Sequence, residues 1–387
     1  MSIQSEINRI SGAKETMREY LAGSGVAVPS DASIDEMAAL LASVPGGGTG
    51  GVELKIVVNV ASGAAVTATK GSKTVSGTSV NGSCTLNVPE VGTWAVNGIL
   101  DGISSATQYV TVVDTYTVSL IFATAVLNDN SWATIGAIAT AGQGANYWSV
   151  GDRKAITLNG RLSRVRFSDD VVYAFILGFN HNAELEGAGR IHFQLAKTAL
   201  SGGSDICFVD ALYDSSTSMT GIGRFTMTAT NKNDGGWESS QMRTAICGGT
   251  PYSYREETLM YIIPADLRAA LKPVTKYTDN TGGGGGSIEA AVTATLDYFF
   301  LLAEYEVFGA SDRANSYEAS KQAQYSYYSA GNSRVKHKHS ATSTAVVWFL
   351  RSPRADYDNS FAAVSTRGSA TTAYAGASRG FAPAFCV

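Results

Sequence analysis

The sequence predicts a multidomain protein with short N-terminal helices, an all-β sandwich and a larger α+β domain. Three observations lead to this prediction. Hydrophobic spacing changes from three- and four-residue steps to alternation after a glycine-rich stretch, and it becomes irregular after residue 124. The 41 glycines and 18 tyrosines against 8 prolines favour turns and strands over long helical bundles. With 44% hydrophobic and 16% charged residues, the 387-residue chain has enough apolar side chains for folded cores.

Residues 1–44 are expected to form two short helices. Ser33 and Glu36 have the spacing of a capping box before a second helix at residues 34–44. Because the sequence offers these helices no adjacent core, we interpret them as an oligomerisation or docking segment. A local helical hairpin is the alternative. Residues 45–51, "PGGGTGG", are expected to form a flexible linker. In the first helix Lys14 interrupts an apolar seam formed by Ile3, Ile7, Ile10, Met17 and Leu21.

Residues 52–124 are expected to form a small β-sandwich of about seven strands. Short alternating segments are separated by glycines, and Asn81-Gly82 favours a type I′ hairpin turn. The stretch from Gly63 to Gly98 resembles the Ig-like or carboxypeptidase-regulatory-like modules of bacterial and phage surface proteins. That resemblance implies a spacer.

Residues 125–387 are expected to form one α+β domain with long loops. Val171–Phe179 is expected to be a buried strand, and a short helix is expected between Pro264 and Pro273. Residues 131–160 are interpreted as short strands joined by turns, one of them at Asn159-Gly160. The glycine run at 281–287 is expected to be a flexible loop.

The sequence predicts no catalytic site, no metal site and no cofactor. Four widely separated cysteines form no metal-binding pair. His181 and His192 flank two glutamates, but polar surface loops explain this pattern better than a metal cluster does. His337 and His339 are expected to lie in a solvated basic loop. A net charge of -4 argues against a nucleic-acid partner.

The C-terminal stretch has a restricted composition between two apolar segments. From Phe349 onward there is no Lys, Glu, Gln, Met or Trp. Trp348 and Phe385 are expected to be core residues, and Arg351 and Ser352 are expected to hold the base of a loop. The residues between are candidates for ligand contact, because tyrosines give rigid contact area and small polar residues give adaptable hydrogen bonds. The candidates are Arg354, Ala355, Asp356, Tyr357, Asp358, Asn359, Phe361, Ser365, Arg367, Ser369, Thr371, Thr372, Tyr374 and Ser378, with Arg379 as a further cation.

A resemblance extends over about residues 128–387. It is carried by "WATIGAIATAGQGANYWSVGDRKAITLNG", "ILGFNHN", "GGWESSQMRT", "YFFLLAEYEVFG", "QYSYYSAGNSRVK", and above all "VVWFLRSP" followed by "GFAPAFCV". Together these resemble the C-type-lectin-like domains of phage and prophage proteins, a group that includes the variable proteins of diversity-generating retroelements. The resemblance implies adenine-directed mutagenesis of Asn codons, which cannot produce the five residue types missing from the terminal stretch.

The resemblance implies a phage tail-fibre or receptor-binding protein that is not an enzyme. Its expected partners are a host-cell-surface protein or glycan, other copies of itself in a homotrimer, and tail or baseplate proteins bound through the N-terminus. Neither nucleic acid nor membrane insertion is expected. With no signal peptide in the polar N-terminus, the protein is expected to be made in the bacterial cytoplasm and to reside in the virion tail. The alternatives are a tail-associated glycan-degrading enzyme and a structural decoration protein.

Overall fold

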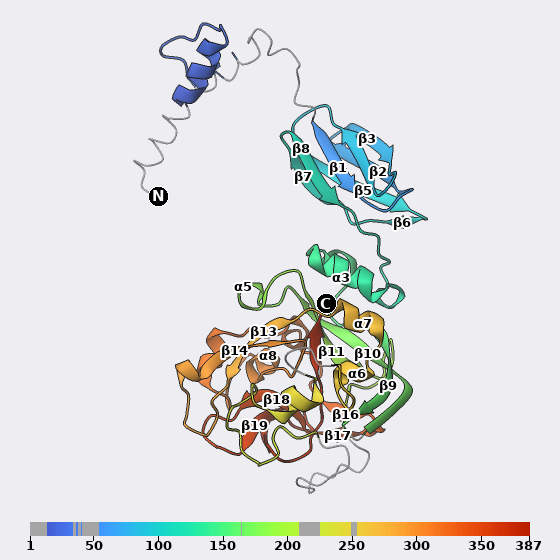
Figure 1. Cartoon of the computed structure of the whole chain (residues 1–387), viewed down its shortest axis with the longest axis vertical. Helices are drawn as coiled ribbons and strands as arrows, with labels where there is room; N and C mark the ends of the chain where they lie inside the picture. The colour runs from blue at the N-terminus through green and yellow to red at the C-terminus, as the bar shows by residue number, and fades with distance from the viewer. Residues whose placement is uncertain are drawn as a thin grey trace. The chain divides into compact units, whose positions relative to one another are not determined.

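The computed structural model shows a β-rich protein of two compact units (Figure 1). It describes residues 14–33, 36–37, 40, 54–163, 165–208, 225–248 and 254–387. The units are Met1–Leu120 and Ile121–Val387, so the division lies slightly before the predicted one at residue 124. Residues 121–124 belong to the larger unit because side chains of that unit hydrogen-bond to their backbone. The Tyr147 hydroxyl donates to the Ile121 carbonyl over 2.8 Å, and the Trp148 indole donates to the Thr124 carbonyl over 3.1 Å.

The described part of the N-terminal segment forms a local helical pair. Residues 14–23 are helical, as are residues 36, 37 and 40. The predicted capping box is present, because the Glu36 amide donates to Ser33 Oγ and the Ser33 amide donates to Glu36 Oε2. Leu21 and Met37 are buried in one small apolar cluster with Val26 and Ala32. The helical-hairpin alternative therefore describes these residues, while Ile3, Ile7, Ile10 and the linker at 45–51 lie outside the described residues.

Residues 54–120 form two sheets, which confirms the all-β prediction for this region. Side chains alternate between core and solvent along the strands, as in β1 (Lys55–Asn59), where Ile56 and Val58 are buried. Asn81 and Gly82 have φ values of 51° and 85°, which confirms the predicted turn. The first sheet has the order β4 (Ser83–Asn87), β1, β8 (Thr115–Ser119), and the second has β3 (Lys73–Thr78), β2 (Ala65–Lys70), β5 (Gly92–Leu100), β6 (Ile103–Ser104), with β7 (Gln108–Val112) also paired to β5.

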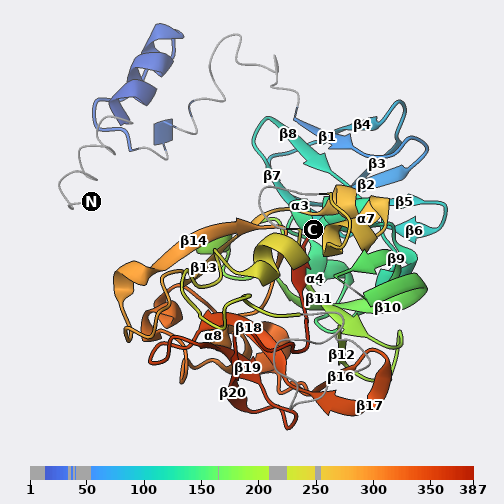
Figure 2. The same cartoon turned by 60° about the horizontal axis from the view of Figure 1, so that its bottom comes forward.

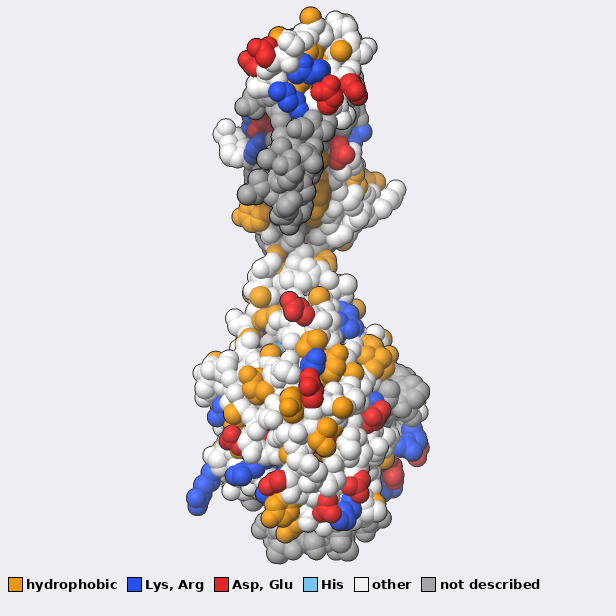
Figure 3. Space-filling model, turned by 90° about the vertical axis from the view of Figure 1, so that its left-hand side faces the viewer, with side chains coloured by type: hydrophobic (Ala, Val, Ile, Leu, Met, Phe, Trp, Pro, Cys, Tyr) orange, Lys and Arg blue, Asp and Glu red, His pale blue; other side chains and the backbone are white. Residues whose placement is uncertain are grey.

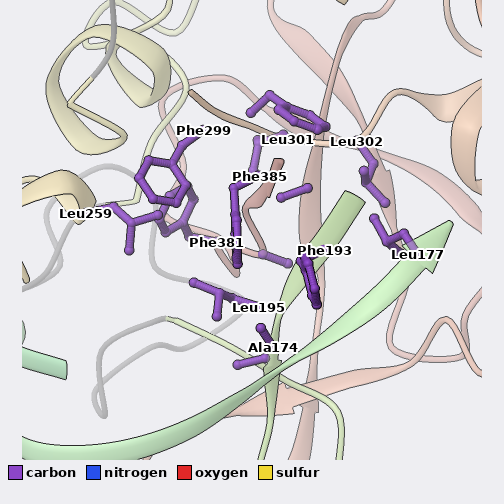
Figure 4. Close-up of a cluster of buried hydrophobic side chains, with 14 of the residues drawn as sticks. Ala174, Leu177, Phe193, Leu195, Leu259, Phe299, Leu301, Leu302, Phe381 and Phe385 are labelled. Carbon is purple, nitrogen blue, oxygen red and sulfur yellow. The ribbon is translucent and has the colours of Figure 1, made fainter. Parts of the chain in front are cut away.

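The larger unit is built around a five-stranded sheet that contains the C-terminal strand. β21 (Ala384–Cys386) lies between β15 (Phe299–Phe300) and β11 (Ile191–Lys197), and β10 (Val165–Phe179) and β9 (Arg153–Leu162) continue the sheet. Phe385 stacks on Phe193 with ring centroids 5.4 Å apart, in the centre of the apolar core (Figure 4). The expected strand is confirmed within β10, where Val172 and residues 174–178 are buried, but Val171 at its beginning is exposed. The C-terminus thus closes the main core.

The described residues of this unit also form three smaller sheets and several short helices (Figure 2). The sheets are β12 (Ile206–Cys207), β16 (Lys336–Lys338), β17 (Ala341–Val346); β13 (Val274–Asp279), β14 (Val292–Asp297); and β18 (Trp348–Pro353), β19 (Ser360–Val364), β20 (Ala370–Tyr374). The helices are α3 (Trp132–Thr140), α4 (Gly144–Tyr147), α5 (Ala183–Glu186), α6 (Leu259–Ile262), α7 (Ala265–Ala270), α8 (Glu304–Phe308) and α9 (Ser326–Ser329), with a π-helical turn at Met242–Ile246 and 3-10 turns at Leu127–Asp129, Glu289–Ala291 and Ser316–Ser320. The helix expected after Pro264 is confirmed as α7. No helix within the described ranges has the length and apolarity needed to cross a bilayer.

The interpretation of residues 131–160 as short strands is wrong over residues 132–147, which contain the helices α3 and α4. Residues 132–140 form the helix α3, and the Ser131 side chain caps it by accepting the Thr134 amide. Trp132, Ile135 and Ile138 are buried at three-residue steps, which is a helical period. The expected turn at Asn159-Gly160 instead lies inside β9.

Candidate ligand-binding site

The two apolar ends of the C-terminal stretch form a rigid frame. Trp348 and Phe385 are fully buried, as predicted, and every residue of β18 and β19 is buried. Gly380 brings the ends together, since the Phe349 amide donates to its carbonyl over 3.1 Å. A Cβ atom at Gly380 would lie 2.3 Å from Cys207 Sγ and 3.0 Å from Trp348 Cβ, so a larger residue would push Gly380 away from both neighbours.

A clamp formed by Asn233 fixes the loop between β18 and β19. We call residues 354–359 the contact loop. Asn233 is fully buried, and its Nδ2 donates to the carbonyls of Arg354 (3.2 Å), Tyr357 (2.7 Å) and Ser360 (2.8 Å). Its backbone amide donates to the Asp358 carbonyl over 2.7 Å. Sequence reasoning missed this residue, because "TNKNDGG" signals only a turn and does not identify a partner more than 100 residues away.

The glycine run at 281–287 is a loop, as expected, but its backbone is bound to Asn233 and to the contact loop. The Gly283 amide donates to Asn233 Oδ1 over 2.8 Å, and the Gly286 amide donates to the Ala355 carbonyl over 2.8 Å. Gly284 has a φ of +69°, and a Cβ atom there would lie 2.8 Å from the Asp358 nitrogen. Glycine is required at this position by both the backbone conformation and the close approach to the contact loop.

Five of the predicted contact residues meet at one hollow of about 380 Å³, which we call the tyrosine hollow. Tyr357 comes from the contact loop and Tyr374 from the end of β20, and their side chains are 53% and 58% exposed. Because Ser360 pairs with Tyr374 across β19 and β20, the contact loop and the end of β20 lie together. The hollow is lined by Arg354, Tyr357, Asn359, Ser360, Thr372, Ala373, Tyr374 and Arg379.

The two aspartates of the contact loop have cationic partners. Arg354 binds Asp356 through Nε (2.6 Å) and Nη2 (3.1 Å), and its guanidinium lies 4.0 Å from the centre of the Tyr357 ring. These hydrogen bonds raise the pKa of Arg354 and lower the pKa of Asp356. Asp358 pairs with Lys232, a second residue that sequence reasoning missed. Both aspartates lie outside the lining of the hollow.

Some predicted contact residues lie away from the hollow. Ser365, Arg367 and Ser369 form the turn at the opposite end of the β19–β20 hairpin, roughly 15 Å away for a five-residue strand. The Ser365 side chain accepts the Arg367 and Ser369 amides and so stabilises that turn. Ala355 and Thr371 are half-buried and do not line the hollow.

The predictions that Phe361 and Ser378 contact a ligand are wrong. Phe361 is fully buried in the core, because β19 is the central strand of its sheet and both of its faces are covered. Ser378 is 5% exposed, and its hydroxyl accepts the Phe225 amide over 3.1 Å. Both residues belong to the frame that positions the contact loop.

A buried charge cluster lies at the base of β18, formed by Glu186, Lys276, Glu306 and Arg351. Lys276 Nζ donates to Glu186 (2.6 Å) and Glu306 (2.9 Å), and Arg351 donates to Glu306 through Nη1 and Nη2. Burial raises the pKa of Glu186 to about 7. Arg351 also donates to the Leu301 carbonyl, which confirms its expected structural position.

The expectation that His181 and His192 lie in surface loops is wrong. Both are buried beside this cluster, and burial lowers the pKa of His181 to about 3, so its ring is neutral. His181, Glu186 and Glu306 have the spacing of a metal site. However, Glu306 already binds both Lys276 and Arg351, so the cation position is filled by the Lys276 ammonium. The described residues therefore favour an internal ion-pair network over a metal centre.

The basic segment around His337 is also more enclosed than expected. Lys336–Lys338 form the strand β16, in which both lysines are buried. The His339 ring lies against Phe167, with centroids 5.7 Å apart. This segment is part of the fold rather than a solvated loop.

Comparison with known families adds one match. Residues 224–387 match a family model described as "Domain of unknown function (DUF6273)". The match covers less than half of the chain, but it contains every predicted contact residue. No curated protein and no solved structure matches the chain.

Proposed function

We propose that this protein is a binding protein without enzymatic activity, and that the tyrosine hollow is its ligand site. The observation that carries this proposal is the convergence of Arg354, Tyr357, Asn359, Thr372 and Tyr374 on one hollow. Their frame is buried and held by many hydrogen bonds, whereas the two tyrosines are exposed. Rigidly mounted tyrosines are typical of recognition surfaces because they lose little conformational entropy on binding.

The wider proposal is a phage tail receptor-binding protein. Residues 54–120 serve as an Ig-like spacer, and residues 121–387 form a C-type-lectin-like domain. Residues 1–44 bind tail proteins and join copies into a homotrimer, in which several weak contacts gain avidity. On the face of the larger unit seen in Figure 3, acidic and basic side chains are interspersed with hydrophobic ones, which supports a ligand other than nucleic acid.

Retroelement diversification of the terminal stretch is part of this proposal. The exposed positions on the contact loop and β20 are mounted on strands whose buried residues keep the frame. The expected genomic signature is a near-copy of the coding sequence for this stretch, differing mainly at adenines, beside a reverse-transcriptase gene. Sequencing of the locus checks this, and a locus without such a copy argues against diversification but not against binding.

The lining of the hollow favours binding over glycan hydrolysis. Most glycoside hydrolases use two carboxyl groups that flank the scissile bond. None of the residues assigned to the lining carries a carboxylate. The hollow therefore has side chains suited to contact a ligand but lacks that acid pair.

Replacing Tyr357 and Tyr374 together with alanine is expected to abolish binding to host cells. Both rings are exposed and make no hydrogen bonds with other described residues, so the free energy of unfolding should change by less than about 1 kcal/mol. Binding is measured by adsorption of the labelled full-length protein to host cells, and folding by thermal unfolding. The matched control replaces Tyr109 and Tyr116, two exposed tyrosines of the smaller unit. Full adsorption by the folded Tyr357/Tyr374 variant contradicts the proposed site.

A further inference from the structure

We infer that the larger unit has a second ligand site, which takes a phosphate group carried by a small hydroxylated molecule such as a sugar phosphate. The site is a hollow of about 340 Å³, which we call the arginine hollow. Its described lining includes Arg161 from β9, Arg166 from β10, Tyr261 from α6 and Glu256. None of the described residues that line it also lines the tyrosine hollow, so this inference goes beyond the proposed function.

Two arginines lie opposite each other across the β9–β10 hairpin. Arg161 and Arg166 are direct partners in the antiparallel register, so their side chains begin about 5 Å apart on the same face of the sheet. Both are exposed, and neither side chain makes a hydrogen bond or an ion pair with another described residue. Like charges in directly opposite positions repel each other. An anion that binds between them therefore removes a destabilising interaction.

The carboxylates near the hairpin leave the two guanidinium groups available. The Asp169 carboxylate accepts from the Asn159 side chain over 2.8 Å, and the Asp170 carboxylate accepts the Ser168 amide over 2.8 Å. Neither aspartate is among the described residues that line the arginine hollow. Glu256 does line it, but it forms no ion pair with either arginine within the described ranges. The described lining thus keeps an excess of positive charge.

The wall of the hollow beside the arginines is a fixed aromatic ring. Gly160 in β9 has a φ of +118°, and a Cβ atom there would lie 3.2 Å from the Tyr261 ring, so glycine allows this ring to pack against the strand. The Tyr254 ring lies 5.1 Å from the Tyr261 ring, and the Arg268 guanidinium lies 4.3 Å from the centre of the Tyr254 ring. The half-buried Tyr261 ring offers flat apolar surface for the C–H face of a sugar.

Two guanidinium groups at one hollow favour a phosphate over a carboxylate. A carboxylate has two oxygens and a single charge, and one arginine fork satisfies it. A phosphate monoester has about −1.5 to −2 charges at pH 7 and three acceptor oxygens, so it can accept from both forks. The volume of about 340 Å³ lies near the lower end of the range of about 300–1,000 Å³ for small-molecule sites, which suits a phosphate with one ring attached.

The test is isothermal titration calorimetry of the full-length protein at low ionic strength. The probes are glucose 1-phosphate, inorganic phosphate, glucuronate and glucose. We expect glucose 1-phosphate to bind more tightly than inorganic phosphate, glucuronate to bind about tenfold more weakly than glucose 1-phosphate or worse, and glucose not to bind.

Substitutions assign the binding to the arginine hollow. Arg161→Gln and Arg166→Gln should each weaken binding of glucose 1-phosphate about tenfold or more, through the loss of charge-assisted hydrogen bonds. Glu256→Gln should strengthen it by about two- to fivefold, because a neighbouring negative charge is removed. Arg367→Gln, at an exposed arginine in the turn between β19 and β20, is the matched control and should change nothing. Thermal unfolding checks that each variant is folded.

Four results would contradict the inference. They are no binding of either phosphate, unchanged binding in both arginine variants, glucuronate binding as tight as that of glucose 1-phosphate, and glucose 1-phosphate binding no tighter than that of inorganic phosphate. None of them bears on the proposed function, because adsorption to host cells through Tyr357 and Tyr374 is measured separately and at a different hollow.

Discussion

Replacing Asn233 with aspartate is expected to release the contact loop and to destabilise the larger unit by on the order of 3 kcal/mol. Asparagine and aspartate have the same shape, but the substitution replaces the Nδ2 donor with a carboxylate oxygen. That oxygen would face the carbonyls of Arg354, Tyr357 and Ser360, which now accept from Nδ2. Three buried acceptors would lose their partner, and the new charge would repel them. Urea unfolding at neutral pH measures the change in free energy.

Limited trypsin digestion reports on the contact loop itself. The Arg354 carbonyl is bound by Asn233, so release of the loop should make the bond after Arg354 an early cleavage site, detected by mass spectrometry. Asn332→Asp is the matched control. Asn332 is exposed and its side chain donates a single hydrogen bond to the Tyr327 carbonyl, so its substitution should cost less than about 1 kcal/mol. Unchanged stability and unchanged cleavage in Asn233→Asp would show that the clamp does not hold the loop.

Replacing Lys276 with methionine is expected to cost about 3–5 kcal/mol at neutral pH, the usual effect of breaking a buried ion pair. Lys276 is fully buried and binds Glu186, Glu306 and the Tyr325 hydroxyl. Without its ammonium group, two carboxylates would share the site with Arg351 alone. A buried carboxylate that has lost its cation holds its proton, so the folded pKa of Glu186 should rise further above its present value of about 7.

The loss of stability in Lys276→Met should depend on pH. Glu186 has an ordinary pKa of 4.5, so above that pH the unfolded chain loses the proton that the folded variant retains. The folded wild type also holds this proton up to about pH 7, so the stability of Lys276→Met should fall relative to the wild type only as the pH rises above about 7, measured by urea unfolding at several pH values. Adding Glu186→Gln should recover part of the loss at the higher pH values, because glutamine is neutral in the folded and the unfolded chain and needs no proton from the solvent to be buried. Lys232→Met, which breaks a surface ion pair with Asp358, should cost less than about 1 kcal/mol. Equal losses for the two lysines would contradict a buried network.

The sequence predicts local structure well where one short-range signal dominates. The capping box at Ser33 and Glu36, the turn at Asn81-Gly82 and the helix after Pro264 are all present. Each depends on hydrogen bonds or backbone conformations of residues close in the chain. The prediction for residues 132–140 is wrong because short apolar segments between glycines fit strands and helices equally. The three-residue spacing of Trp132, Ile135 and Ile138 is the sequence signal that indicates the helix.

Long-range contacts explain the errors at the candidate site. Phe361 has the chemistry of a contact residue, but strands on both sides and a covered face make it a core residue. The glycine run at 281–287 has the composition of a linker, yet Gly284 packs on the backbone of the contact loop. Asn233 and Lys232 gave no signal, because their partners are more than 100 residues away in the chain.

By itself, the sequence determined the β-rich multidomain character, the apolar ends of the terminal stretch and the exposed tyrosines between them. Alternation, turn residues and composition encode these features locally. The tertiary structure decided which candidates meet, which are buried, and that His181 and His192 lie beside an internal ion-pair network. Burial and partner choice depend on strands that are far apart in the chain and pair only after folding, so no local pattern specifies them.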